Sequence, residues 1–287
     1  MLGTGLLDRL TVGDHICWLV DDDRVRMHEI AAFVRAGLRD HHKILYCGDR
    51  PETVLAGIDE LGIDTVPAVA SGQLTATTAE AVYLPGGVFE PEAVLGAWVP
   101  LAGAARAAGY AGIRVLGDMS WSGRRRPGID RLCRYESQVN RVTIANDAIG
   151  VCVYDRRTTD PLELRRLAWQ HPGMAATGAP YDERLALRIR RTRDPAGLAL
   201  SGEADLAGRN ALRVVIDHLF DDAGTDEVTI DVSGLRFADR AAARILVRAA
   251  QGSRRLRLVG CSPALLRLLA FTGADEAPCL SVEPADR

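Results

Sequence analysis

The 287-residue sequence predicts two α/β units: a doubly wound, mostly parallel sheet with helices on both faces, followed by a smaller α/β sandwich. Three observations support this fold class. Short apolar stretches alternate with stretches of helical periodicity along residues 1–175. The alternation stops at residues 173–184, which carry glycine, proline and polar side chains, and then resumes. The length fits two domains of about 100–200 residues each. We therefore expect domains at 1–175 and 187–287, joined by a linker at 176–186.

Five strands are expected in the first unit, because each stretch is short, apolar and followed by turn residues. They are HICWLV (His15–Val20), KILYCGD (Lys43–Asp49), QLTATTA (73–79), GIRVLGDMSW (112–121) and AIGVCVYDRR (148–157). Five helices are expected at residues 23–38, 50–62, 91–109, 128–146 and 160–171. Pro51 and Pro161 stand near first helical positions, where proline is tolerated, whereas Pro100 is expected to kink or divide its helix.

The second unit repeats the alternation on a smaller scale. An arginine-rich stretch, RIRRTRD (188–194), is expected to be an edge strand whose charges face solvent. Further strands are expected at 197–206, 227–235, 255–261 and 280–283, and helices at 208–224, 238–252 and 262–274. The strand at 227–235 is expected to turn through Ser233 and Gly234 before the next helix begins.

Composition argues against several classes of function. The formal net charge is −3, so no overall field attracts nucleic acid or an anionic membrane, and no aromatic residues interleave with the basic run at 188–194. No run of about 18 apolar residues predicts a membrane span, and the first residues lack a signal-peptide pattern. The six cysteines form no C-x-x-C pair. We therefore expect reduced thiols in a cytoplasmic protein, with neither a disulfide framework nor a zinc site.

Two segments of the second unit resemble the STAS domain of anti-sigma factor antagonists. They are LALSGEADL (198–206) and VTIDVSGLRFADRAAARIL (228–246), and RLRLVGCSPALLRLLAFTGADE (255–276) matches the strand and helix that follow them in that family. The resemblance covers about residues 185–284 and implies a small α/β sandwich that binds an anti-sigma factor or a related protein kinase. The residues that we expect to contact this partner are Asp205, Ser233, Asp239, Arg240 and Ala241.

The regulatory serine of that family is missing from this sequence. The family's partner kinase phosphorylates a serine at the start of the helix after the central strand, where a phosphate switches docking. Aligned on Phe237 and Asp239, the serine position falls at Ala241, which has no hydroxyl. Ser233 is the nearest alternative, but it precedes the expected helix, where a turn hydrogen bond accounts for it. We therefore expect a docking domain without this phosphorylation switch.

The first unit carries ordered motifs that resemble the MEDS domain, a sensory domain of bacterial regulators. The motifs are GDHICWLVDD, KILYCGDRPETVLAGIDELGID, SGQLTATTAEAVYLPGGVFEP, GIRVLGDMSW, RYESQVNRV and CVYDRR, within about residues 5–175. The resemblance implies a RecA-like core that senses a ligand and is joined to a signalling output. The family's ligands are poorly defined, so the cofactor is unknown. A phosphate-binding G-x-x-x-x-G-K-[ST] loop is absent, which argues against ATP hydrolysis.

Polar and aromatic residues gather where the strands of the first unit end. Ligands of open α/β sheets bind at the carboxyl ends of the strands. The residues Asp49, Asp118, Trp121 and Tyr154 follow or close successive strands, so we expect them to line one ligand pocket. A helix cap or a solvated loop end is the alternative role for each single aspartate.

Three further residues are candidates for the same site. His15 and Cys17 alternate along one strand and face the same side, so they form either a nucleophilic or metal-binding pair or a buried histidine and thiol. Glu136 lies on an expected helix, where it either points toward Asp118, with a raised pKa, or occupies the surface.

The sequence thus predicts a bacterial signal-transduction regulator of transcription, in which a sensory domain is coupled to a protein-binding domain. Its expected ligand-binding residues are His15, Cys17, Asp49, Asp118, Trp121, Glu136 and Tyr154. We assign no catalytic residue and no metal ligand, and a homodimer stays open. Two alternatives remain: an enzyme or nucleotide- or small-molecule-binding protein that acts at the acidic strand ends, and a module that serves only assembly.

Overall fold

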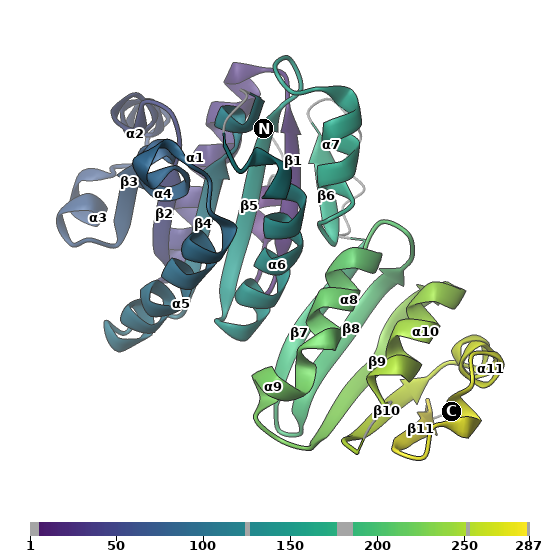
Figure 1. Cartoon of the computed structure of the whole chain (residues 1–287). Coiled ribbons are helices and arrows are strands. Elements are labelled where there is room, and N and C mark those ends of the chain that lie inside the picture. Colours follow the sequence, from purple (N-terminus) through teal and green to yellow (C-terminus); the bar gives the residue numbers. More distant parts are fainter. Residues whose placement is uncertain (1–5, 124–126, 177–185, 251–252, 286–287) are drawn as a thin grey trace. The chain divides into compact units, whose positions relative to one another are not determined.

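The computed structural model describes residues 6–123, 127–176, 186–250 and 253–285 (Figure 1). Contacts divide the chain into two compact units. The predicted class, a doubly wound and mostly parallel sheet followed by a smaller α/β sandwich, is confirmed. Most of the expected linker, residues 177–185, lies outside the described residues, while residues 173–176 form a strand.

The first unit is built on six strands in the order β3-β2-β4-β5-β1-β6. The strands are β1 (His15–Val20), β2 (Lys43–Cys47), β3 (Leu74–Thr77), β4 (Ile113–Asp118), β5 (Ala148–Asp155) and β6 (Gly173–Ala176). The strands from β3 to β1 pair in parallel along this order, so their carboxyl ends meet at one edge of the sheet.

Helices cover both faces of this sheet (Figure 1). They are η1 (Leu6–Arg9), α1 (Asp23–Arg39), α2 (Pro51–Glu60), α3 (Val66–Ala70), α4 (Ala79–Tyr83), η2 (Pro85–Gly87), α5 (Pro91–Ala107), η3 (Ser120–Gly123), η4 (Ile129–Arg131), α6 (Leu132–Ala145) and α7 (Pro161–Ala168). Successive side chains of β4 point to opposite faces of the sheet. The guanidinium of Arg114 packs over the Phe33 ring of α1, whereas the neighbouring Ile113 packs against Ala102 of α5.

Helix α5 runs as a single helix from Pro91 to Ala107, so of the two expected effects of Pro100, a kink or a division, the division does not occur. Proline at this position removes one backbone hydrogen bond to the carbonyl of Gly96. Both Pro100 and Gly96 are exposed, so water can satisfy that carbonyl. The helix therefore tolerates the proline on its solvent side.

The second unit is a five-stranded sheet in the order β11-β10-β9-β8-β7. Its elements are β7 (Leu187–Arg193), β8 (Ala196–Ala204), α8 (Arg209–Asp217), α9 (Leu219–Ala223), β9 (Glu227–Ala238), α10 (Arg240–Ala249), β10 (Arg255–Cys261), α11 (Pro263–Phe271), η5 (Ala274–Glu276) and β11 (Leu280–Pro284). Only β7 pairs antiparallel with its neighbour, and it lies at the edge, as expected of its arginine-rich sequence.

Two local features of the second unit differ from the sequence-based expectation. The helix expected at 208–224 is two helices, because the ring of His218 lies 3.0 Å from the carbonyl of Val214, to which its own backbone N–H would donate in a continuous helix. The strand expected to turn at Ser233 instead continues to Ala238. Gly234 serves a close approach and not a turn, since a Cβ there would lie 2.7 Å from the Cβ of Ser201 on β8.

Asp239 fixes the start of α10. Its carboxylate accepts hydrogen bonds from the backbone N of Ala242 at 2.7 Å and from Nη2 of Arg209 at 2.6 Å. Burial acts to raise the pKa of Asp239, but the hydrogen bonds from Ala242 and Arg209 outweigh it, so the pKa lies below its ordinary value. The partner arginine lies 30 residues earlier and was not predicted from the sequence.

We expect Asp239→Ala to destabilise α10 by about 1–2 kcal/mol at neutral pH, the usual cost of losing a helix cap. Because the folded-state pKa is lowered, this stabilisation is present above the unfolded pKa of about 3.9 and is lost as the pH falls through the folded pKa. Hydrogen exchange of α10 peptides, read by mass spectrometry, should be faster in the variant at pH 7. Equal exchange rates in the two proteins at pH 7 would contradict the capping role.

No helix among the described residues combines the length and the apolar character that a bilayer crossing needs.

Candidate functional site

A cavity of ≈ 440 Å³ opens at the carboxyl ends of the parallel strands in the first unit. It lies past the ends of β2, β4 and β5, where the open α/β sheet is expected to bind ligands. The charged residues that line it are Asp23, Arg26, Asp49, Arg50, Asp118, Asp155 and Arg157. The wall is therefore of mixed charge, and its arginines were not anticipated from the sequence.

Most carboxylates of this cavity are already neutralised. Asp118 is 2 % exposed, and it accepts hydrogen bonds from Arg26 and from the hydroxyl of Ser120, the latter at 2.6 Å. Arg157 donates to Asp155 at 2.6 Å and to Asp23 at 2.6 Å. The hydrogen bond from Arg157 holds the pKa of Asp155 below its ordinary value. Such paired carboxylates have little capacity left to bind a divalent cation.

A carboxylate side chain caps the start of α1. The carboxylate of Asp22 accepts hydrogen bonds from the backbone N of Arg24 at 2.8 Å and of Val25 at 2.9 Å. A nucleotide phosphate bound after the first strand of a P-loop protein uses such N–H groups. Here the carboxylate of Asp22 accepts hydrogen bonds from two such N–H groups.

The expected ligand-binding residues separate into different places. Asp49 and Asp118 line the strand-end cavity, and Trp121 and Tyr154 do not. Trp121 is 3 % exposed and stacks on Tyr83, with ring centroids 5.5 Å apart. Tyr154 is fully buried because its side chain leaves the strand on the face covered by α6, one residue before the strand end. Side chains alternate along a strand, so proximity to its end does not place every residue in the same cavity.

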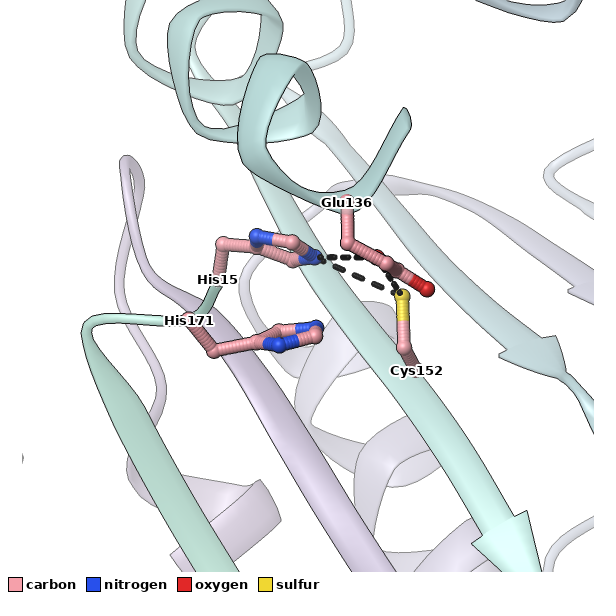
Figure 2. A group of neighbouring side chains, drawn as sticks. All are labelled: His15, Glu136, Cys152 and His171. Carbon is pink, nitrogen blue, oxygen red and sulfur yellow. Dashed lines mark hydrogen bonds and ion pairs between the residues drawn. The ribbon is translucent and has the colours of Figure 1, made fainter. Parts of the chain in front are cut away.

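A second group of polar side chains lies buried beneath α6. It comprises His15 of β1, Glu136 of α6, Cys152 of β5 and His171, from the turn between α7 and β6; Figure 2 shows these side chains pointing toward one another. Each of these residues is buried, and their ligand atoms all lie within 4.8 Å of one another. We call these four residues the buried cluster.

Strand register and helix packing bring the buried cluster together. β1 pairs with β5 so that His15 lies beside Gly150 and Cys17 beside Cys152. A Cβ at residue 150 would lie 2.9 Å from Cδ2 of His15, so the glycine leaves room for the imidazole ring. His15 and Cys17 face the same side of β1, as expected, but His15 contacts Cys152 at 3.4 Å.

Glu136 corrects another expectation. It neither points to Asp118 nor lies on the surface: it is fully buried, with its Oε2 3.1 Å from the Sγ of Cys152. Its Oε1 accepts a hydrogen bond from Tyr154. The reason is the placement of α6, which turns Glu136 toward the sheet, and helical periodicity alone does not tell which sheet residues lie opposite.

Burial also controls the acidity of the thiols and phenol around Glu136. Burial, and next the charge of Glu136, raises the pKa of Cys17, Cys152 and Tyr154 well above their ordinary values. The two thiols are therefore protonated at neutral pH, which excludes a reactive thiolate in this arrangement.

Two members of the buried cluster were not predicted from the sequence. Cys152 was expected, with the other cysteines, only to be a reduced thiol, although its alternation with Tyr154 resembles that of His15 and Cys17 on the neighbouring strand. His171 gave no signal, because it lies in a turn and joins the cluster only through the fold.

In the second unit the expected partner-binding residues gather at one end of the sheet, with one exception. The backbone N of Asp239 donates to the carbonyl of Ala204 at 2.9 Å, so Asp205 and the start of α10, with Arg240 and Ala241, are adjacent. Ser233 lies six residues before Asp239, exposed, within β9. The second residue of α10 is Ala241, which has no hydroxyl group that a kinase could phosphorylate.

A groove of ≈ 460 Å³ lies beside this end, between the last part of β9 and α11. Phe237 and Phe271 line it and are 51 % and 70 % exposed, unusual values for phenylalanine. The guanidinium of Arg240 lies 4.8 Å from the centre of the Phe271 ring. This cation–π contact explains how α10 tolerates a cation in its first turn.

Comparison with known proteins places both units in families. The model of the MEDS family, the MEthanogen/methylotroph, DcmR Sensory domain, matches residues 14–172, more than half of the chain. A second model, described as Mlab, STAS domain, matches residues 187–282. These matches agree in kind and order with the sequence resemblances, and the topology confirms a doubly wound, mostly parallel sheet followed by a STAS-type sandwich.

Solved structures show a more distant likeness. The KaiC-like protein from the hyperthermophilic archaeon Pyrococcus horikoshii OT3 is 8% identical, with a TM-score of 0.44, over 66% of this chain and 78% of that chain. The flagellar accessory protein FlaH from Methanocaldococcus jannaschii is 11% identical, with a TM-score of 0.41, over 70% of this chain and 84% of that chain. No curated protein matches the chain. The chain therefore belongs to the MEDS family and carries a STAS domain after its sensory domain.

Proposed function

We propose that this protein is a signalling regulator in which the MEDS domain senses a small molecule and the STAS domain docks onto an anti-sigma factor or a related protein kinase. In a bacterial cytoplasm, such docking would release a sigma factor and so regulate transcription. The observation that carries the proposal is the groove between β9 and α11 with its exposed Phe237 and Phe271. Exposed aromatic side chains around a groove are typical anchors of protein interfaces.

The chemistry of the groove supports a particular kind of partner surface. Arg236, Arg267 and Arg240 lie in or beside it, next to the two phenylalanines. An acidic partner surface with apolar anchor residues complements this arrangement, because arginine binds carboxylates and the phenylalanines remove apolar area from water.

Docking is proposed to be independent of phosphorylation at the helix start. Ala241 has no hydroxyl, and the cap residue Asp239 and the Arg240 that follows it give that region fixed charges. Control of docking then falls to the MEDS domain and its ligand and not to a covalent mark on α10.

The strand-end cavity of ≈ 440 Å³ is the proposed ligand site of the MEDS domain. Its mixture of carboxylates and guanidinium groups suits a small polar ligand that offers both donors and acceptors. An enzyme that binds a metal at these acidic strand ends gains no support, because Asp118 and Asp155 are paired with Arg26 and Arg157.

Calorimetric titration tests the docking proposal. The full chain is titrated with purified anti-sigma factor kinases encoded by the same genome, with and without Mg-ATP, and the protein's intact mass is measured afterwards. We expect one kinase to bind with the same affinity in both conditions and the mass to stay unchanged. Absence of binding to every such kinase contradicts the docking role, and an added phosphate on Ser233 contradicts the loss of the switch.

A further inference from the structure

We propose that the buried cluster of His15, Glu136, Cys152 and His171 is a binding site for a divalent transition metal, with zinc as the best-fitting ion. The proposal goes beyond ligand sensing at the strand ends, and it rests on different residues. All four lie within the match to the MEDS family. Two imidazoles, a thiolate and a carboxylate together form a ligand set that zinc accepts.

The distances among His15, Glu136 and Cys152 match those of a tetrahedral site. Zinc bonds of about 2.0–2.3 Å to nitrogen, oxygen and sulfur place neighbouring ligand atoms about 3.4–3.6 Å apart in a tetrahedron. Nε2 of His15 lies 3.4 Å from Sγ of Cys152 and 3.5 Å from Oε2 of Glu136. The Sγ and Oε2 atoms are 3.1 Å apart. These three ligand atoms need to move by only a few tenths of an ångström to enclose an ion, whereas the ligand atom of His171, which lies within 4.8 Å of them, has further to move.

Surrounding hydrogen bonds orient the His15 ring for coordination. The amide nitrogen of Asn140 donates to the carbonyls of Glu136 at 3.2 Å and of Ser137 at 2.9 Å. The amide oxygen of Asn140 is thereby turned to Nδ1 of His15, 3.0 Å away. It accepts a hydrogen bond from the Nδ1–H group. The opposite nitrogen, Nε2, then carries the lone pair and faces the cluster. Metal-bound histidines commonly hold their second nitrogen in this way.

Glu136 is held in the same manner. Tyr154 donates its hydroxyl proton to Oε1, so Oε2 is the oxygen that faces Cys152 and His15. Both oriented ligands therefore present one coordinating atom to the same point, while their other polar atom is fixed by a neighbour.

The charges of the buried cluster also fit a dication. A buried carboxylate is costly unless a positive charge compensates it. On binding, the Cys152 thiol loses its proton to solvent, and the sulfur–hydrogen bond is replaced by a sulfur–metal bond. The ion's two positive charges are then balanced by one thiolate and one carboxylate, with both imidazoles neutral. A metal of charge two leaves this site without net charge.

Metal uptake by the full-length, tag-free chain tests the proposal. The protein is stripped with a chelator in mild denaturant, refolded, and loaded with Co²⁺ or Zn²⁺ alone. We expect one equivalent of each metal, and for Co²⁺ the absorption of a tetrahedral ion together with a thiolate charge-transfer band. X-ray absorption at the zinc edge should show one sulfur at about 2.3 Å, the remaining ligands being nitrogen or oxygen at about 2.0–2.2 Å.

Matched variants assign the ligands. Cys152→Ser should abolish the charge-transfer band and weaken metal binding at least about 100-fold, since it removes the only thiolate. Cys47→Ser is the control, because Cys47 is equally buried in the same core but lies outside the buried cluster. Asn140→Ala should weaken binding about 10–100-fold and leave the band, because it only orients His15.

The outcomes are decisive in both directions. A wild-type chain that takes up no stoichiometric metal, or a Cys152→Ser chain that keeps the thiolate band, overturns the proposal. If a variant fails to fold, the zinc-edge spectrum of the wild type decides. No sulfur, or two sulfurs with Cys17 as the second, would rule out the assigned ligand set.

Discussion

Replacing Arg114 with methionine is expected to lower the free energy of unfolding of the MEDS domain by about 3–5 kcal/mol. Arg114 is fully buried on β4, and burial lowers its pKa to about 10, so it remains charged at neutral pH. Removing a buried and hydrogen-bonded charge leaves its partners without a donor in a site that water does not reach.

The contacts of Arg114 explain the size of this effect. Nη2 donates to the carbonyl of Leu10 at 2.9 Å, and Nη1 donates to those of Leu7 and Phe33, each at 3.4 Å. Nε donates to Nδ1 of His42 at 3.1 Å. One side chain therefore joins the segment around η1, helix α1 and the turn before β2. Methionine has a similar length but no donor, so all of these acceptors lose their partner at once.

Tryptophan fluorescence in urea measures this loss in the intact chain. Of the four tryptophans, Trp18, Trp98 and Trp121 lie in the first compact unit and Trp169 belongs by its contacts to the second, so the signal reports mainly the first domain. Arg134→Met is the matched control, because Arg134 is 71 % exposed and pairs with Glu92 at the surface. Its change should stay below about 1 kcal/mol. A comparable change in both variants would contradict the role given to Arg114.

The contact between Arg114 and His42 also predicts a pH dependence. Burial first, and then the charge of Arg114, holds the pKa of His42 below its ordinary value. In the unfolded chain His42 therefore takes up a proton near pH 6.5, whereas in the folded chain the His42 ring stays neutral until a lower pH. The stability of the MEDS domain should consequently fall as the pH decreases from about 6.5 to the folded pKa of His42. Urea midpoints measured across this range, which should fall less in His42→Gln, check the expectation.

The second large effect concerns docking. Phe271→Ser is expected to weaken the affinity for the proposed partner, an anti-sigma factor or related kinase, about 10–100-fold, as loss of an aromatic anchor does in other interfaces. Phe271 is 70 % exposed, so the fold loses little packing when the ring is removed. Leu162→Ser is the matched control, because Leu162 has a similar exposure of 69 % but lies on α7 of the other domain. An unchanged affinity in Phe271→Ser would remove the groove as the docking surface.

Arg240 sharpens this test. Since its guanidinium lies 4.8 Å from the Phe271 ring, the two side chains should act as one unit in the interface. Arg240→Glu should therefore weaken binding less in a Phe271→Ser chain than in the wild type. Additive effects in a double-mutant cycle would show that the two residues contact the partner independently.

Local periodicity explains what was predictable in this protein. The strands and helices of both units follow from apolar alternation and helix caps, and the strand-end position of Asp49 and Asp118 follows from the parallel sheet. The order of strands does not follow from local pattern, because β1 lies beside β5, more than 100 residues later in the chain. The pairing of Cys17 with Cys152 and the meeting of His15 with Glu136 depend on that order.

The remaining errors have the same physical origin. Trp121 and Tyr154 were expected at the cavity because they lie near strand ends, but their orientation depends on strand alternation and on the aromatic core. The strand through Ser233 was expected to turn, because glycine favours turns, whereas Gly234 is needed for contact with a neighbouring strand. The residue types marked Trp121, Tyr154 and Gly234 as unusual in the sequence. The roles of these residues depend on tertiary contacts, which a local pattern does not contain.

The aspartate at the start of α1 has a consequence for how an anion could bind beside this helix. The carboxylate of Asp22 accepts hydrogen bonds from the backbone N–H groups of Arg24 and Val25, which an anion at the helix N-terminus would otherwise use. An anionic ligand of the strand-end cavity would therefore have to displace this carboxylate or bind through side chains such as Arg26 and Arg157. Recognition by guanidinium side chains, and not by the helix end, is the arrangement that this capped helix favours.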